Sequence, residues 1–205
     1  MAIKIVEVVG ESDKYERFLY RCLAPYPFRR YRKRTQYLEM AAPKGLRKEV
    51  LFMDEDAVGQ IEYALVEASG YPISGDGVWV MNCIWVLRRA KGHRFGKMLV
   101  KRMVDAACDA SGFATVGLED HPSPWLRLPQ MEYLGFRSLG SAEMHHKVKR
   151  PEVCFKAHLM WMPVRKDAEP PVMDWKALLK GVDFCSAHPL YRAERLGLEE
   201  VYEEC

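Results

Sequence analysis

Long apolar runs and an excess of one charge are both absent from this sequence of 205 residues. No stretch reaches the roughly 18 uninterrupted apolar residues that a membrane-spanning helix needs. The longest apolar stretch, 78–87, is interrupted by Asn82. Residues 1–9 include Lys4 and Glu7 and alternate like a strand, which is unlike a signal peptide. We therefore expect a cytoplasmic protein with no membrane partner.

Cysteine motifs are also lacking, although the chain has 6 cysteines. No two of them form a Cys-x-x-Cys pair and none stands at zinc-finger spacing from a histidine, so we predict no metal site. The neighbouring His145 and His146 are expected in a solvated loop. Cys83, Cys108 and Cys154 lie within apolar runs, where cysteine behaves as a small buried hydrophobe. This usage favours a reduced compartment.

The charge is small and mixed, with a formal net charge of +3. Hydrophobic residues make up 49% and charged residues 29%, proportions that are typical of a folded globular protein. Basic residues gather at one place, namely Arg29, Arg30, Arg32, Lys33 and Arg34. Such a run either forms a solvated helix face or attracts an acidic substrate or a polyanion. No recognised nucleic-acid motif accompanies it, so nucleic acid is not the partner that we expect.

Hydrophobic periodicity predicts alternating strands and helices, followed by a C-terminal extension. The predicted strands are 2–9, 48–53, 58–67, 78–86, 114–118, 137–139 and 153–162. The predicted helices are 13–23, 28–40, 95–111, a short one that ends near residue 134, 175–180 and 191–204. Composition shifts after Pro163, so we expect one domain over 1–163. The extension over 164–205 is expected to pack on that domain or on a partner subunit, as in a homodimer.

A glycine-containing basic loop joins the apolar strand 78–86 to the helix that begins at Phe95. A helix N-terminus leaves backbone N–H groups unpaired and carries a partial positive charge. Gly92 and Gly96 lack a Cβ atom and let a bulky anion approach the backbone. Lys91 and Lys97 add positive charge nearby. The loop therefore predicts a pyrophosphate-binding site.

The stretch Lys91-Gly92-His93-Arg94-Phe95-Gly96 resembles the Arg/Gln-x-x-Gly-x-Gly/Ala loop of GNAT acetyltransferases. The ending Glu132-Tyr133-Leu134-Gly135-Phe136 is similar to that family's helix running into Leu-Gly-Phe, and the predicted order of elements over 2–162 is also similar. The sequence departs from the motif at Arg94, where the family usually has glycine. We expect Arg94 to adopt ordinary helical dihedrals and to donate its backbone N–H all the same.

This resemblance implies an α+β fold of three layers (α/β three-layer), the GNAT fold, with a mixed central sheet of about seven strands flanked by helices. It also implies an N-acetyltransferase that transfers the acetyl group of acetyl-CoA to an amine by direct attack in a ternary complex. The residues expected to contact acetyl-CoA are Cys83, Ile84, Trp85, Val86, Lys91, Gly92, His93, Arg94, Phe95, Gly96 and Lys97.

The catalytic groups are less defined by the sequence. The resemblance suggests a general base among Glu62, Glu119 and His121, which follow or lie in strands that face the cleft in the family. Each also has a plainer interpretation, as a solvated strand residue or a polar strand end. Met131 stands where the family often has a tyrosine acid. A GNAT-fold module that binds acyl-CoA with weak or no transfer is therefore the alternative.

Overall fold

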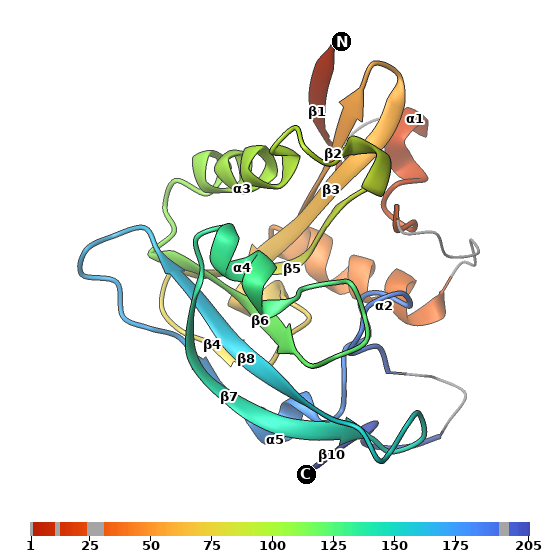
Figure 1. The fold of residues 1–205 in the computed structure, drawn as a ribbon. Coiled ribbons are helices and arrows are strands. Elements are labelled where there is room, and N and C mark those ends of the chain that lie inside the picture. Colours follow the sequence, from red (N-terminus) through yellow and green to blue (C-terminus); the bar gives the residue numbers. More distant parts are fainter. Residues whose placement is uncertain (1, 11–12, 24–30, 193–196) are drawn as a thin grey trace.

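The strands of the computed structural model, which describes residues 2–10, 13–23, 31–192 and 197–205, form two sheets (Figure 1). Within these residues the main sheet has 8 strands, and only the β5–β6 pair is parallel. Its order is β1 (Ile3–Glu7), β2 (Arg47–Met53), β3 (Asp56–Leu65), β5 (Val78–Val86), β6 (Gly112–Glu119), β8 (Cys154–Pro163), β7 (Arg137–His146) and β10 (Tyr202–Glu204). A small second sheet pairs β4 (Ile73–Ser74) with β9 (Val172–Met173).

Helices cover both faces of the main sheet (Figure 1). Side chains alternate between the two faces of a strand, so the side chains of neighbouring residues in β3 contact the helices on opposite faces of the sheet. The Cβ position of Gly59 lies 3.3 Å from Leu99 of α3 (Phe95–Ala106), whereas Glu62 on the other face bonds Arg34 of α2 (Arg32–Ala41). The predicted mixed sheet flanked by helices is confirmed, with β10 as an addition to the expected strands.

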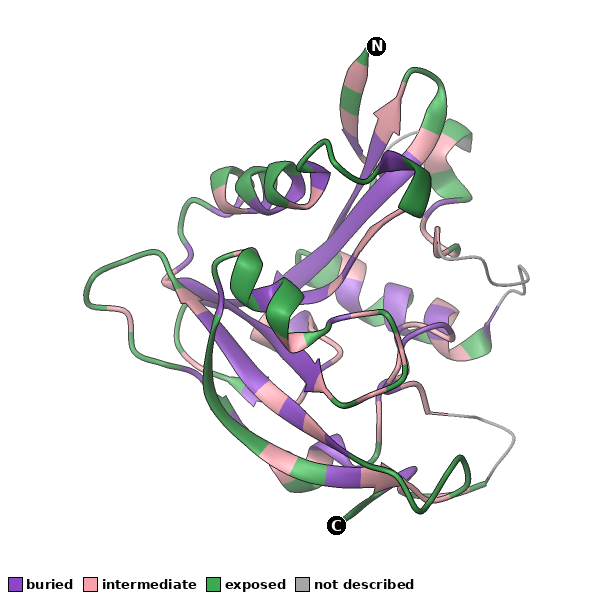
Figure 2. Ribbon diagram, viewed as in Figure 1, coloured by how far each residue is buried: buried purple, intermediate pink, exposed green. Residues whose placement is uncertain are grey.

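The central strands β3, β5 and β6 are buried over most of their length (Figure 2). The apolar run predicted for 78–86 is confirmed as β5, which lies in the middle of the sheet. The remaining helices are α1 (Asp13–Glu16), α4 (Leu128–Tyr133) and α5 (Trp175–Leu178), and the short 3-10 turns are Ala42–Lys44, Val66–Ala68 and Arg88–Ala90. None of the helices among the described residues is long and apolar enough to cross a membrane.

The first predicted helix is much shorter than expected. It ends at Glu16 instead of continuing to residue 23, and residues 11–12 before it lie outside the described residues. Phe18 donates its N–H to Tyr15 in a tight turn and packs edge-on against Phe52 of β2 at 5.6 Å. Short helices are marginal in water, and the contact with Phe52 holds this segment against β2 instead. The start of the second predicted helix at residue 28 also lies outside the described residues.

The C-terminal segment joins the same core as the sheet. Leu178, Phe184 and Tyr202 are buried in the main hydrophobic cluster. The helix predicted over 191–204 is wrong, because Tyr202–Glu204 forms the strand β10, which pairs with β7, and residues 193–196 are not described. Pairing with the edge of β7 satisfies the backbone while the Tyr202 ring is buried, which outweighs the helical pattern of the sequence.

A disulfide joins Cys154 at the start of β8 to Cys205, with the two Cα atoms 6.3 Å apart. Cys108 is exposed. The expectation of a buried, reduced cysteine is therefore wrong for Cys154, and for Cys108 it is wrong in the burial alone, because Cys108 is a free cysteine.

Candidate active site

The two parallel strands in the middle of the sheet separate soon after they begin. β5 and β6 pair only at Val78–Val80 and Gly112–Ala114. The hydroxyl of Thr115 then reaches the carbonyl of Met81 at 2.7 Å, and the ladder ends there although β5 continues to Val86. A strand edge released in this way can hydrogen-bond an extended ligand.

A cavity of about 890 Å³, here called cavity 1, opens beside the free end of β5. Its walls are the end of β5, the loop before α3, the first turn of α3, the loop after β6, and α4. Most of the residues expected to contact acetyl-CoA line it, namely Ile84, Trp85, Val86, Lys91, Gly92, Arg94, Phe95 and Gly96. No acidic residue is among its described lining residues, while Arg88 and Arg127 add to its positive charge. Such a lining suits a phosphate-bearing ligand.

Three of the expected contact residues do not line cavity 1. The His93 ring stacks on Phe95 with centroids 5.1 Å apart. The Lys97 ammonium lies 4.3 Å from the centre of the Tyr133 ring. Cys83 points to the face that α2 covers, where its sulfur lies 3.9 Å from the amide of Gln60. The structure therefore brings most of the predicted contact residues together and places these three beside them.

The N-terminus of α3 has the geometry of an anion site. Its N-cap, Arg94, makes no side-chain capping bond among the described residues, so the first N–H groups of the helix face cavity 1 uncapped. Arg94 has φ 58° and ψ 25°, which is the left-handed conformation. The expectation of ordinary helical dihedrals is therefore wrong. The sharp turn into α3 requires a positive φ at this position, which accounts for the glycine that the motif usually has there.

Replacement of Arg94 by glycine should stabilise the fold. The left-handed conformation costs a non-glycine residue roughly 1 kcal/mol, and relief of this strain is partly offset by the larger unfolded-state entropy of glycine. We expect Arg94→Gly to raise the free energy of unfolding by about 0.5 kcal/mol, measured by urea denaturation. Lys91→Gly is the control, because Lys91 has φ −68° and should lose stability. An equal loss in both variants would show that Arg94 carries no strain.

A second cavity, of about 650 Å³ and here called cavity 2, lies on the other side of Trp125. The Trp125 ring lines both cavities and stands edge-on to Trp85, with centroids 5.1 Å apart. Cavity 2 is walled by the loop that follows β6, by the hairpin between β7 and β8, and by the C-terminal segment. The two cavities therefore share Trp125 as a wall, and Trp85 of β5 packs against its ring.

A pair of histidines lies in the wall of cavity 2. The Nε2 atoms of His121 and His146 are 3.1 Å apart, and the backbone N–H of Ser123 donates to Nδ1 of His121. Since a backbone N–H can only donate, neutral His121 carries its proton on Nε2 and donates to His146. Burial lowers the pKa of each ring to about 4. Both rings are thus neutral at pH 7, and the lone pairs of His121 Nδ1 and His146 Nε2 already accept hydrogen bonds.

No protein-family model and no curated protein matches the sequence. Solved structures do match the fold. The ribosomal-protein-S18-alanine N-acetyltransferase of Escherichia coli matches 82% of this chain and 97% of its own, with 10% identity and a TM-score of 0.55. A Bacillus subtilis acetyltransferase in complex with CoA matches 80% of this chain and 100% of its own, with 12% identity and a TM-score of 0.52. The chain has the GNAT fold.

The GNAT fold inferred from the loop 91–96 and from the order of elements is thus confirmed. A third match is a GNAT family acetyltransferase from Elizabethkingia anophelis with acetyl-CoA bound, which covers 79% of this chain and 98% of its own, with 14% identity and a TM-score of 0.50. Identities this low establish the fold alone, so the activity has to be argued from the site.

The predicted base Glu62 lies on β3 of the GNAT fold, on the face where Arg34 of α2 packs. Its carboxylate receives two hydrogen bonds from Arg34, at 2.8 and 2.6 Å, and Lys48 lies 3.6 Å away. Burial alone would raise the pKa of this carboxyl, but the charges of Arg34 and Lys48 hold the pKa below its usual value. Glu62 is 3% exposed, so its interpretation as a solvated strand residue is wrong.

The predicted base Glu119 lies at the end of β6 and lines neither cavity 1 nor cavity 2. Hydrogen bonds from His158 and Lys156 lower the pKa of its carboxyl. The third candidate, His121, lies in cavity 2. The GNAT fold therefore places Glu62, Glu119 and His121 at three separate places.

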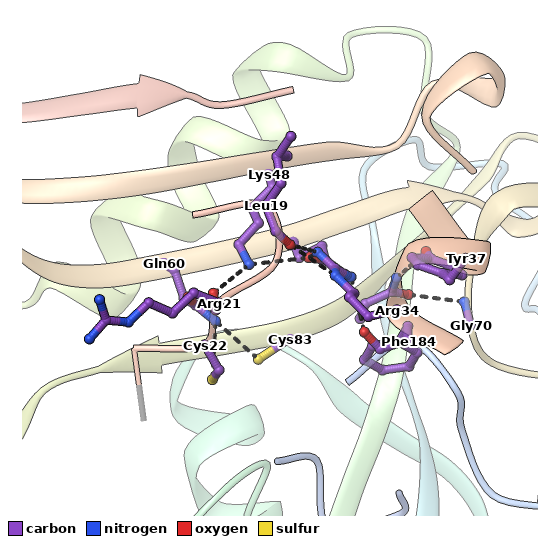
Figure 3. A network of polar contacts seen from close by, with 12 residues as sticks. Leu19, Arg21, Cys22, Arg34, Tyr37, Lys48, Gln60, Gly70, Cys83 and Phe184 are labelled. Atoms are coloured by element: carbon purple, nitrogen blue, oxygen red, sulfur yellow. Dashed lines mark hydrogen bonds and ion pairs between the residues drawn. The ribbon is translucent and has the colours of Figure 1, made fainter. Parts of the chain in front are cut away.

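The basic run before β2 contributes to the interior of the GNAT fold. Arg34 is buried, and besides Glu62 it donates to the carbonyls of Leu19 and Phe184 (Figure 3). Lys33 lies 3.6 Å from Asp183. The interpretation of the run as a solvated face is therefore wrong for Arg34, while Arg29 and Arg30 lie outside the described residues.

Most of the residues that line cavity 2 were not predicted from the sequence. The solvated loop expected for His145 and His146 is wrong, because β7 extends to His146. His146 pairs with a residue 25 positions away, and no local pattern connects the two segments. Trp125 could have been noticed only as an aromatic residue in a proline-rich passage after β6.

A third histidine predicts acid sensitivity of the fold. His188 accepts the N–H of Leu190 on Nδ1, lies 2.5 Å from the Tyr71 hydroxyl through Nε2, and is buried, which lowers its pKa to about 3. Its unfolded pKa is about 6.5, so at pH 5 the unfolded state binds a proton that the folded state rejects. From this residue we expect a loss of about 2 kcal/mol between pH 7 and pH 5.

Urea denaturation at both pH values measures this loss. His188→Gln should reduce the pH-dependent part of the unfolding free energy by the same amount. An unchanged pH dependence in His188→Gln would contradict the assignment of a neutral, buried imidazole.

Proposed function

We propose that this protein is an N-acetyltransferase that transfers the acetyl group of acetyl-CoA to an amine by direct attack within a ternary complex. The observation that carries the proposal is the coincidence of two features in cavity 1. The released edge of β5 and the uncapped N-terminus of α3 line the same space. An extended arm with a pyrophosphate at one end requires both.

In this proposal the pyrophosphate lies against the first turn of α3, where Gly92 and Gly96 leave the backbone open. The pantetheine arm lies along Ile84–Val86 and takes hydrogen bonds from that strand edge. Acetyl-CoA supplies an activated thioester. A backbone N–H at Trp85 or Val86 polarises its carbonyl, as an oxyanion donor does, and the two cavities hold the reactants at the wall that they share.

One observation favours the second candidate, a module that binds acyl-CoA with weak or no transfer. Met131, which is 1% exposed, occupies the position where a tyrosine acid is expected, and it lines cavity 1. A thioether cannot protonate the leaving thiolate. Tyr133 also lines cavity 1 but is 58% exposed.

A calorimetric titration with acetyl-CoA, followed by a thiol-release assay with a panel of amines, tests both candidates. Saturable binding with release of CoA thiol supports the transferase. Binding without thiol release from any amine in the panel supports the binding module. A folded protein that does not bind acetyl-CoA would overturn both.

A further inference from the structure

The charge of the cavity 2 lining points to its ligand. Lys149 and Arg150 line it, and its described lining includes no aspartate or glutamate. Among the described residues neither cation forms an ion pair, whereas Lys147 lies 3.4 Å from Glu200 and Lys156 lies 3.4 Å from Glu119. Two unpaired cations at the mouth of a pocket without acids favour an anionic group in the ligand.

The rest of the cavity 2 wall is apolar or neutral. Its apolar lining includes Trp125, Phe155, Val153 and Pro189. The lone pair of His121 Nδ1 is bound to the N–H of Ser123, so this histidine does not offer an acceptor for an ammonium group. Ligand pockets of this size and kind enclose an apolar body and orient it by a few polar groups.

We propose, building on the proposed function, that cavity 2 binds the acetyl acceptor, a small amine that carries a carboxylate at the opposite end of an apolar body. The amine lies at the Trp125 end, next to cavity 1, and the carboxylate lies at the hairpin between β7 and β8, with Lys149 and Arg150. The two ends of the cavity thus select the two ends of the acceptor.

The transfer consumes the free-amine form of the acceptor, which carries the nucleophilic lone pair. In the transfer, a bond forms between the amine nitrogen and the acetyl carbonyl carbon while the carbon–sulfur bond breaks. The nitrogen loses one proton, and the departing CoA thiolate takes one up. This balance needs no strong base in the cavity.

Matched probes test the acceptor class. Para-(aminomethyl)benzoate and para-(aminomethyl)benzamide share one shape and differ only in the charge of the group opposite the amine. We expect calorimetry, with saturating acetyl-CoA and without it, to show roughly tenfold tighter binding of the benzoate. The double variant Lys149→Glu/Arg150→Glu should reverse this preference. The control double variant Lys166→Glu/Lys176→Glu changes the net charge equally, at exposed positions that do not line cavity 2, and should keep it.

The outcomes separate this inference from the proposed function. Equal affinities for the benzoate and the benzamide, or a preference that survives Lys149→Glu/Arg150→Glu, would overturn the inference. The proposed transferase function would still stand if other amines caused release of CoA thiol. A benzoate preference that depends on these two residues, in a protein that binds no acetyl-CoA, would count against the transferase and support the ligand class of cavity 2.

Discussion

Substitution of Gly96 by glutamate should weaken acetyl-CoA binding by at least about 100-fold while the fold is retained. Gly96 is the second residue of α3 and lines cavity 1. A Cβ atom there would lie 3.3 Å from the side chain of Leu134, so a longer side chain extends into the cavity. A carboxylate at this point takes the place of the pyrophosphate and repels it, and it also stabilises the N-terminus of α3.

Calorimetric titration with acetyl-CoA, together with a thermal unfolding curve for each variant, measures this effect. Gly140→Glu is the matched control, because it adds the same charge on β7, where a Cβ atom has no neighbour within 4 Å. Gly96→Ala should bind with intermediate affinity, since the flexible Leu134 side chain can move by a few tenths of an ångström. Undiminished binding by a folded Gly96→Glu protein would exclude cavity 1 as the cofactor site.

Local sequence patterns were sufficient to predict the elements around cavity 1, because these elements follow one another in the chain. The apolar run 78–86, the glycine-containing loop and the helical spacing that begins at Phe95 are adjacent in the chain, and the structure has them as β5, the loop and α3. Each element is specified by its own periodicity and by the glycines next to it. The backbone conformation of Arg94 was mispredicted, because a charged residue does not reveal a position that requires a positive φ.

The parts that sequence reasoning missed depend on contacts between distant segments. The His121–His146 pair forms because β7 is long enough to carry His146 back to the loop after β6, and the strength of that pairing is not visible in residues 137–146 alone. The strand β10 forms by pairing with the edge of β7, and the disulfide joins Cys205, just after β10, to Cys154 of β8. Both features therefore depend on segments that are far apart in the chain. Arg34 appeared to be a surface residue because its partner Glu62 lies 28 positions away.

Replacement of Glu62 by glutamine should cost about 4 kcal/mol of unfolding free energy, which is the second large effect. Glutamine keeps the shape of the side chain but leaves Arg34 and Lys48 buried without a counter-charge, 6% and 3% exposed respectively. Removal of one partner from a buried ion pair is far more costly than removal of a surface pair. The same chemical change at Glu119, Glu119→Gln, should leave the unfolding free energy nearly unchanged, because its ion pairs are open to solvent.

This comparison also decides the role of Glu62. A positioning role for Glu62, in which its carboxylate fixes Arg34 and through it Leu19 and Phe184, predicts that the folded fraction of Glu62→Gln still binds acetyl-CoA and still transfers the acetyl group. A general base instead predicts that the folded fraction binds acetyl-CoA but has lost transfer. Because the pKa of the carboxyl is held low, its contribution to stability is present at neutral pH and is lost as the pH falls below about 4. The stability difference between wild type and Glu62→Gln should therefore shrink in acid, and urea denaturation at pH 7 and at about pH 3 measures it.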